Sequence, residues 1–353
     1  GSEEHALERA KRTGEPVEVL SSRTEISETH ALPNGNLRQT QHTSPVRVKR
    51  EGTWTPVDTT LAEAAGRIAP KAAAGRVTFS AGGNAPLVVL ADQGRTLSLS
   101  WPTPLPAPVL DGSTATYRNV LPDVDLAVAA SVDGFSQALI VKTPQAADNP
   151  ELTAIDFGLK ADGLTLKKDP ESGAVTALNP AGQPVFSTST ARMWDSSGTE
   201  PQTPPPAAQS RKASSPVARS AKASAPAEKS AGAPVSAPPS DLTPGANSAD
   251  VGVQVTGDKL ILTPDQALLD SPKTTYPVYI DPRVTGTRQA WTIAYKPHPT
   301  SSYWNGTGWG GGTTGEARVG YESSTKGTAR SFFRVDSKFL AGVKVVDAQF
   351  QIT

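Results

Sequence analysis

The sequence contains no cysteine, so no disulfide can hold any part of it and a cysteine nucleophile is excluded. A secreted protein without disulfides depends on its apolar core, so the missing cysteines do not settle the compartment. No apolar run approaches the roughly 20 residues that a membrane helix needs, and we expect no membrane span in this fragment.

An excess of basic charge is also absent, because 34 lysines and arginines balance 34 aspartates and glutamates. A general nucleic-acid binder usually carries a basic excess that neutralises phosphates. We therefore expect no nucleic-acid partner.

Catalytic signatures are missing as well. There is no G-x-S-x-G, no P-loop and no H-E-x-x-H, and no pair of carboxylates is singled out as a glycosidase pair would be. Of the scattered histidines, His30 and His42 flank a predicted turn and could face each other across a hairpin. No carboxylate spacing supplies further metal ligands. We expect a non-enzymatic chain without metal or cofactor; a hydrolase whose site the sequence does not reveal is the alternative.

Proline and glycine are abundant, with 32 and 30 residues. Proline lies well above its usual share of about 5%, and these residues punctuate many short apolar runs. The pattern predicts an all-β, β-sandwich-like multi-stranded domain with many turns.

The first 16 residues form a leader, in which Glu3–Arg12 holds helix formers and no proline. We expect a helix of one to three turns or a frayed segment, and Gly1-Ser2 is typical of the remnant of a cleaved tag.

In residues 17–198, apolar and polar residues alternate with a period of two, which predicts a β-rich domain with about ten residues per strand. Within it, Pro33–Asn36 predicts a hairpin turn, and the alanine-rich stretch Leu61–Ala74 fits either a loop or a short helix. Further strands are expected at Val17–Val19, Val46–Lys49, Thr53–Thr59, Val77–Phe79, Leu87–Leu90, Leu97–Trp101, Phe135–Lys142, Ile155–Leu159, Leu164–Lys168, Val175–Leu178, Val185–Ser187 and Met193-Trp194.

The segment Tyr117–Val128 is interpreted as a turn followed by a strand in the middle of a sheet. Alternation places Val124, Leu126 and Val128 on one face and the two aspartates, Asp123 and Asp125, on the other. We favour solvated turn and edge positions for both aspartates; a calcium or catalytic carboxylate pair is the alternative.

Residues 199–250 are almost entirely Pro, Ala, Ser, Thr, Lys and Glu, and such a composition predicts a disordered low-complexity segment. We favour a solvated, mildly basic linker or loop over a polyanion-binding tail or a protease-sensitive region. Residues 251–283 regain alternation and are too few for a core of their own. We expect them to return to the first sheets, with a separate small module as the alternative.

Residues 284–353 differ in composition from the preceding residues, because they contain the glycine-rich, aromatic stretch Ser301–Gly312. Tyr303, Trp304 and Trp309 are the candidate ligand-binding residues, because flat aromatic faces pack on sugar rings or on another protein. Alternatively, both tryptophans cover an edge of the fold. Strands are expected at Arg318–Tyr321, Ser331–Val335 and Val343–Ile352, and the last alternation runs to Thr353, so we expect the natural protein to continue.

Two blocks resemble a known group of proteins. Tyr117–Leu126 (YRNVLPDVDL) with Phe135–Lys142 (FSQALIVK) is similar to a block in the N-terminal β-rich regions of very large secreted actinomycete proteins, in which glycine is commoner where Asp123 stands. These modular proteins carry LamG-like, DNRLRE or Rhs-repeat modules further along. Tyr276–Pro282 and Trp291–Tyr295 resemble the junction that follows, and residues 288–353 resemble the first part of a DNRLRE-type module.

The resemblance implies that 284–353 is a partial carbohydrate-binding-type β-sandwich. It also implies the N-terminal scaffold or binding region of a large secreted or cell-surface protein. Its partner would be a polysaccharide or cell-wall glycan, or downstream domains of the same polypeptide. The alternative is a cap or shell-associated region of an Rhs-like polymorphic toxin. Fold-level analogy alone does not establish function.

Overall fold

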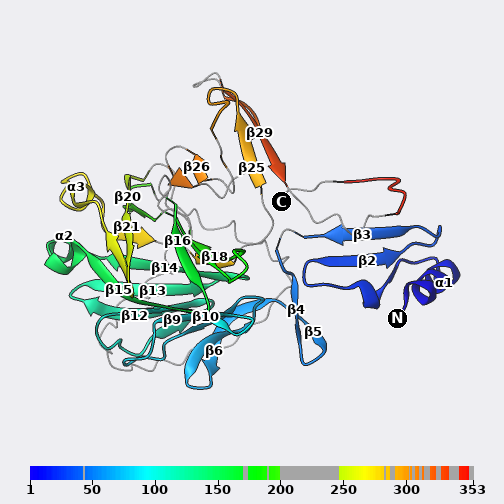
Figure 1. Cartoon of the computed structure of the whole chain (residues 1–353), viewed down its shortest axis with the longest axis horizontal. Helices are drawn as coiled ribbons and strands as arrows, with labels where there is room; N and C mark the ends of the chain where they lie inside the picture. The colour runs from blue at the N-terminus through cyan, green and yellow to red at the C-terminus, as the bar shows by residue number, and fades with distance from the viewer. Residues whose placement is uncertain are drawn as a thin grey trace, which may run out of the picture.

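The computed structural model shows an almost entirely β-stranded chain, which confirms the predicted fold class (Figure 1). Most strands stack in one sandwich, while α1, β2 and β3 lie to one side of it and β25 and β29 project from another. The structure describes residues 1–42, 44–169, 174–188, 191–198, 246–281, 284–286, 291–301, 303, 307–309, 312–313, 319–322, 327–333 and 342–349. Segment 199–245, most of the range predicted to be disordered, lies outside them.

The N-terminal residues form a small helix-and-sheet unit instead of a leader. Helix α1 (Glu3–Thr13) is capped by Ser2, whose Oγ accepts a hydrogen bond from the His5 amide, and by Gly14 in the left-handed conformation. Ala6 and Ala10 of α1 are buried in the same small cluster as Val19 and Ala31. The remaining elements are β1 (Val17–Glu18), η1 (Leu20–Ser22), β2 (Ser27–Ala31) and β3 (Leu37–Gln41).

A two-stranded ribbon connects this unit to the sandwich. It consists of β4 (Arg47–Arg50) and β5 (Thr53–Pro56), joined by a turn at Glu51-Gly52. The turn between β2 and β3 likewise contains Pro33–Asn36.

The first sheet of the sandwich runs in the order β21-β22-β15-β10-β9-β8-β7-β6 among the described residues. Its strands are β6 (Asp58–Ala64), β7 (Arg67–Ala72), β8 (Arg76–Phe79), β9 (Val88–Asp92), β10 (Arg95–Ser100), β15 (Ile155–Asp162), β21 (Gly252–Thr256) and β22 (Lys259–Thr263).

The second sheet follows the path β11-β12-β13-β14-β24-β18-β17-β16, and β14 also pairs with β23, which leads through β19 to β20. These strands are β11 (Val109–Asp111), β12 (Thr114–Leu121), β13 (Val124–Ala130), β14 (Gly134–Val141), β16 (Thr165–Lys168), β17 (Val175–Leu178), β18 (Pro184–Thr188), β19 (Arg192–Trp194), β20 (Ser248–Asp250), β23 (Val278–Asp281) and β24 (Val284–Gly286). The short helices are α2 (Pro144–Ala147), η2 (Pro150–Leu152) and α3 (Gln266–Leu269). Among the described residues, no helix has the length and apolar character needed to cross a membrane.

The interpretation of Leu61–Ala74 as a loop or short helix is wrong, because the stretch spans most of the hairpin β6–β7. Its turn is Ala65-Gly66, both with positive φ, as a tight hairpin requires. Leu61, Ile68 and Ala72 are buried in alternation. The alternation of buried and exposed positions was not recognisable in the sequence, because the intervening residues include many alanines. Alanine is as compatible with a helix as with either face of a strand.

The turn expected at the start of Tyr117–Val128 is also misplaced. Residues from Tyr117 to Leu121 belong to β12, and the turn is at Pro122-Asp123 before β13. Strand β13 lies between β12 and β14 as expected, and both of its faces are buried.

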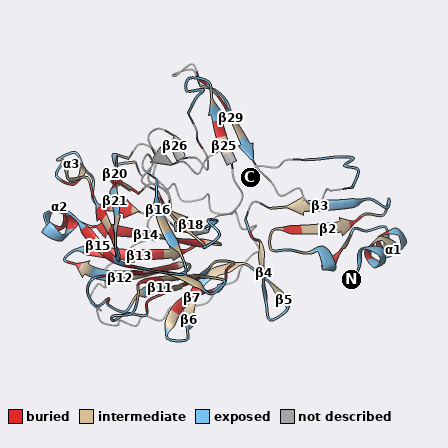
Figure 2. Ribbon diagram, viewed as in Figure 1, coloured by how far each residue is buried: buried red, intermediate tan, exposed pale blue. Residues whose placement is uncertain are grey.

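One apolar core fills the space between the two sheets (Figure 2). Leu97, Leu99 and Trp101 point into it from one face of the β10 segment, as their alternation predicts. Two edge-to-face aromatic pairs lie in it: Phe79–Phe135 joins the two sheets, with ring centroids 6.2 Å apart, and Trp101–Phe157 links neighbouring strands of the first sheet, with centroids 5.4 Å apart. Strand β14 is almost wholly buried, and it contains the continuous apolar run Ala138–Val141.

Residues after 245 complete both sheets. Strand β22 pairs with β15 over Ile155–Gly158, and β23 pairs with β14 over Leu139–Val141. Ser248–Asp250 forms β20 within the range predicted to be disordered. Val284–Gly286 pairs with β14 and β18, although the sequence assigned it to the C-terminal module.

The C-terminal residues form smaller sheets. Strands β25 (Trp291–Tyr295), β29 (Gly327–Phe333) and β28 (Gly320–Glu322) make one sheet, and β26 (Thr307–Trp309) pairs with β27 (Gly312–Thr313). The strand predicted at Val343–Ile352 is not observed over the described residues 343–349, which are exposed and unassigned to any sheet. Without a neighbouring strand, an alternating sequence gains no ladder hydrogen bonds.

A small apolar hollow of about 30 Å³ remains between the sheets, lined by residues including Val175, Ala177 and Leu260. We predict that Val175→Ile fills it and stabilises the fold by about 0.5–1 kcal/mol, the usual gain from one buried methylene. Urea unfolding measures the change. The matched control Val89→Ile lies on the half-exposed side of β9. An equal effect of both substitutions would contradict the assignment of the hollow.

Candidate functional site

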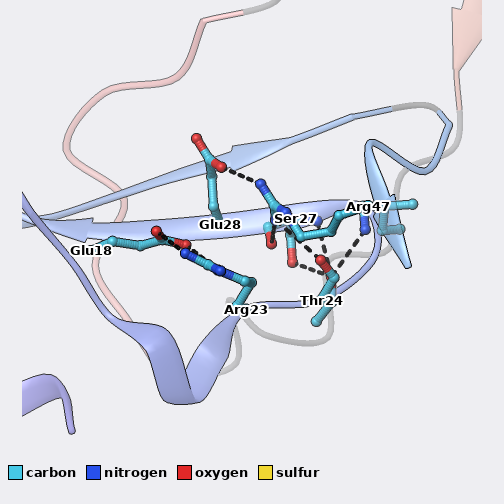
Figure 3. A network of polar contacts seen from close by, with 7 residues as sticks. Glu18, Arg23, Thr24, Ser27, Glu28 and Arg47 are labelled. Carbon is cyan, nitrogen blue, oxygen red and sulfur yellow. Dashed lines mark hydrogen bonds and ion pairs between the residues drawn. The ribbon is translucent and has the colours of Figure 1, made fainter. Parts of the chain in front are cut away.

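An ionic network connects the N-terminal sheet to the ribbon (Figure 3). Arg47 of β4 donates hydrogen bonds to the carbonyl oxygens of Thr24 and Ser27, at 3.1 and 3.0 Å, and pairs with Glu28. Arg23 pairs with Glu18 in a two-point contact, which lowers the pKa of Glu18. Both arginines are engaged within the fold; Arg47 positions the ribbon against the N-terminal sheet, and the Arg23–Glu18 pair holds the N-terminal unit itself.

The histidines do not converge on a metal. His30 lies opposite Arg38 in the β2–β3 register, so His30 and His42 do not face each other across the hairpin. His42 follows β3 and donates its amide to the carbonyl oxygen of Ile26. Within the residues that the structure describes, no three His, Asp or Glu side chains gather in the way a metal site requires.

Asp125 is not solvated, as the sequence suggested, but is 1% exposed. Its Oδ1 lies 2.7 Å from the Lys142 Nζ and accepts the amide hydrogen of Asn119 at 2.7 Å. Lys142 also donates to the Asn119 Oδ1 at 2.9 Å. Asp123, by contrast, is exposed in the turn and has a positive φ, a backbone conformation that favours glycine. The two carboxylates therefore have different surroundings and form no pair.

Tyr117 is the third polar residue of this block and is fully buried. Its hydroxyl donates to the Ser80 carbonyl oxygen at 2.7 Å, and burial raises the pKa of the phenol. The Tyr117 phenol therefore stays protonated, and its hydrogen bond to the backbone at Ser80, directly after β8, connects β12 to the opposite sheet. Tyr117 and Asp125 of this block therefore each hold separate strands of the sandwich together.

Asp195, which is fully buried just after β19, is a heavily hydrogen-bonded carboxylate. Its Oδ1 accepts hydrogen bonds from the Ser197 amide, the Ser197 hydroxyl and the Asn247 amide, at 3.1, 2.6 and 2.9 Å. Its Oδ2 accepts from the Asn247 Nδ2 at 2.9 Å and from the Thr275 amide at 3.0 Å. We call Asp195, Ser197, Asn247 and Thr275 the Asp195 clamp.

The clamp determines the ionisation of its carboxyl group. Burial alone would raise the pKa of Asp195, but the hydrogen bonds from Ser197, Thr275 and Asn247 lower it to about 2. The carboxylate is therefore charged at neutral pH and saturated with donors. It joins residues on both sides of segment 199–245.

The predicted aromatic site is only partly described. Tyr303 is 6% exposed and packs in a small cluster with Ile293 and Ala329, so its ring is a core element. Trp304 lies outside the described residues. Trp309 ends β26, and its partner across the hairpin is Gly312, which has no side chain.

No protein family, curated protein or solved structure matches this chain.

Sequence reasoning missed the Asp195 clamp because its partners are distant along the chain: Asn247 is 52 residues away and Thr275 is 80. The one local signal was the Asp-Ser-Ser run directly after a buried Met-Trp pair, since aspartate in such a run often accepts nearby amides.

We predict that Asp195→Asn destabilises the fold by about 2–4 kcal/mol, because an NH₂ group then faces donors in a buried site. Chemical denaturation measures the loss. The control is Asp156→Asn, whose side chain is 40% exposed and pairs with Lys259 on the surface; it should cost less than about 1 kcal/mol. Equal losses would mean that the clamp is unimportant.

The same carboxylate predicts a pH dependence. Its folded pKa of about 2 lies below the ordinary 3.8, so its contribution is complete above about pH 4 and is lost as the pH falls toward 2. We expect the parent to lose about 2 kcal/mol more than Asp195→Asn between pH 4.5 and pH 2. Parallel denaturation curves at each pH test this; identical pH profiles would contradict it.

Lys142→Met should destabilise by about 2–4 kcal/mol, because it leaves the buried Asp125 carboxylate without its cation. Lys160→Met is the control, since that lysine is 74% exposed in a surface pair. The double variant Asp125→Asn/Lys142→Met should lose less than the sum of the single losses. Strict additivity would show that the two groups do not interact.

Proposed function

We propose that this chain is a non-enzymatic scaffold and binding region of a large secreted or cell-surface modular protein, and that it contacts polysaccharide or cell-wall glycan. The support from the sequence is the resemblance carried by the Tyr117–Leu126 block and by residues 288–353. The support from the fold is that the buried carboxylates Asp125 and Asp195 are bonded in structural roles.

The observation that carries the sugar contact is the β26–β27 hairpin. It places Trp309 in a glycine-rich ribbon, opposite a residue without a side chain. Flat aromatic rings such as that of tryptophan are the side chains on which sugar rings pack. Tyr303, in the same C-terminal part of the chain, packs in a small core with Ile293 and Ala329.

We expect the full chain to bind at least one polysaccharide on an array of bacterial cell-wall and other glycans. Trp309→Ala and Trp304→Ala should each weaken that binding at least about tenfold, as loss of a stacked ring predicts. The control is Trp54→Ala on the β4–β5 ribbon, whose ring has Lys49 5.6 Å from its centroid. No bound glycan, or equal binding by all three variants, would overturn the proposal.

A further inference from the structure

Segment 199–245 divides the sandwich into two pieces that share their sheets. From the second piece, β22 extends the first sheet beside β15, and β23 inserts into the second sheet between β14 and β19. Strand β20 pairs with β19, and β24 pairs with β14 and β18. Every strand from β20 to β24 therefore belongs to a sheet that contains strands of residues 1–198.

The apolar core is also shared between the pieces. Six residues of the second piece are members of the main core cluster: Val251, Leu260, Leu262, Leu269, Val278 and Ile280. Three of them, Leu262, Val278 and Ile280, have no exposed area. Buried side chains in strands at two places of the sandwich make a broad apolar interface, which is the main source of stable association.

Polar contacts at the point of division fix the orientation of the pieces. The Asp195 carboxylate binds donors of Asn247 and Thr275, and the Asp195 amide donates to the Asn247 carbonyl oxygen at 3.0 Å. The Ser196 amide donates to the Thr275 carbonyl oxygen at 2.9 Å, and the Ser196 hydroxyl donates to that of Pro277 at 2.6 Å. The ends of the two pieces are thus held by direct bonds at the base of the inserted segment.

We propose that residues 246–286 bind residues 1–198 as a separable partner, so that the fold persists when the connection through 199–245 is cut. The interface consists of the ladders to β14, β15, β18 and β19, the shared core and the Asp195 clamp. The product of a single cut is then a stable two-chain protein. This inference does not depend on the proposed sugar contact.

The test uses the full chain with the recognition sequence of a site-specific protease placed between residues 201 and 240. After cleavage, confirmed on a denaturing gel, both fragments should elute together on gel filtration at micromolar concentration and melt in one cooperative transition. The melting temperature of the cut protein should fall on hundredfold dilution, while that of the uncut protein should not change, because only the cut form dissociates into two molecules.

Interface variants make the test specific. Leu262→Ala should lower the melting temperature of the cut protein and cause its fragments to separate at a dilution where the cut parent remains associated. Ile261→Ala, on the half-exposed side of the same strand, is the control. Separation of the cut parent without denaturant would overturn the proposal. Resistance to cleavage in the native state would also overturn it, because the connection would then be part of the packed fold.

Discussion

The pairing of β23 with β14 is the interaction on which the rest of the sandwich depends. Strand β14 is buried on both faces, and Val278 and Ile280 of β23 have no exposed area. A central strand with an open edge would expose unpaired backbone groups in the middle of the sheet. Residues that follow a 47-residue segment, 199–245, fill that edge, and the Asp195 clamp holds the chain where it leaves and re-enters.

Charged groups in this fold stabilise junctions. Asp125 pairs with Lys142 beside the β12–β13 hairpin, Arg47 joins the ribbon to the N-terminal sheet, and Asp195 joins the two pieces of the sandwich. Each is buried or half-buried and has several partners, which is the condition under which buried charge is tolerated. A fold without disulfides thus gains its long-range connections from hydrogen-bonded ions and strand ladders.

The alternation of apolar and polar residues was sufficient to predict the all-β class and most strands. Successive side chains of a strand point to opposite faces of the sheet, so the alternation indicates which face is buried. It failed at Leu61–Ala74, where alanines weaken the contrast between faces, and at Val343–Gln349, where a strand needs a neighbour that sequence alone does not specify. The structural roles of Asp125 and Asp195 could also not be predicted from the sequence. Lys142 is 17 residues from Asp125, and Asn247 and Thr275 are 52 and 80 residues from Asp195, so only the topology brings these distant partners to the carboxylates. Of the three aromatic candidates, Tyr303 proved to be a core residue, because an aromatic ring fits a small core as well as a binding face.

Amide hydrogen exchange of the intact chain tests most directly whether strands beyond residue 245 complete the sandwich. The account predicts that the amides of Val278 and Ile280 in β23 exchange as slowly as those of Leu126 and Val128 in β13, because both strands open only when the whole sandwich unfolds. Fast exchange in β23 beside slow exchange in β13 would contradict it, since the sandwich would then be stable without its second piece.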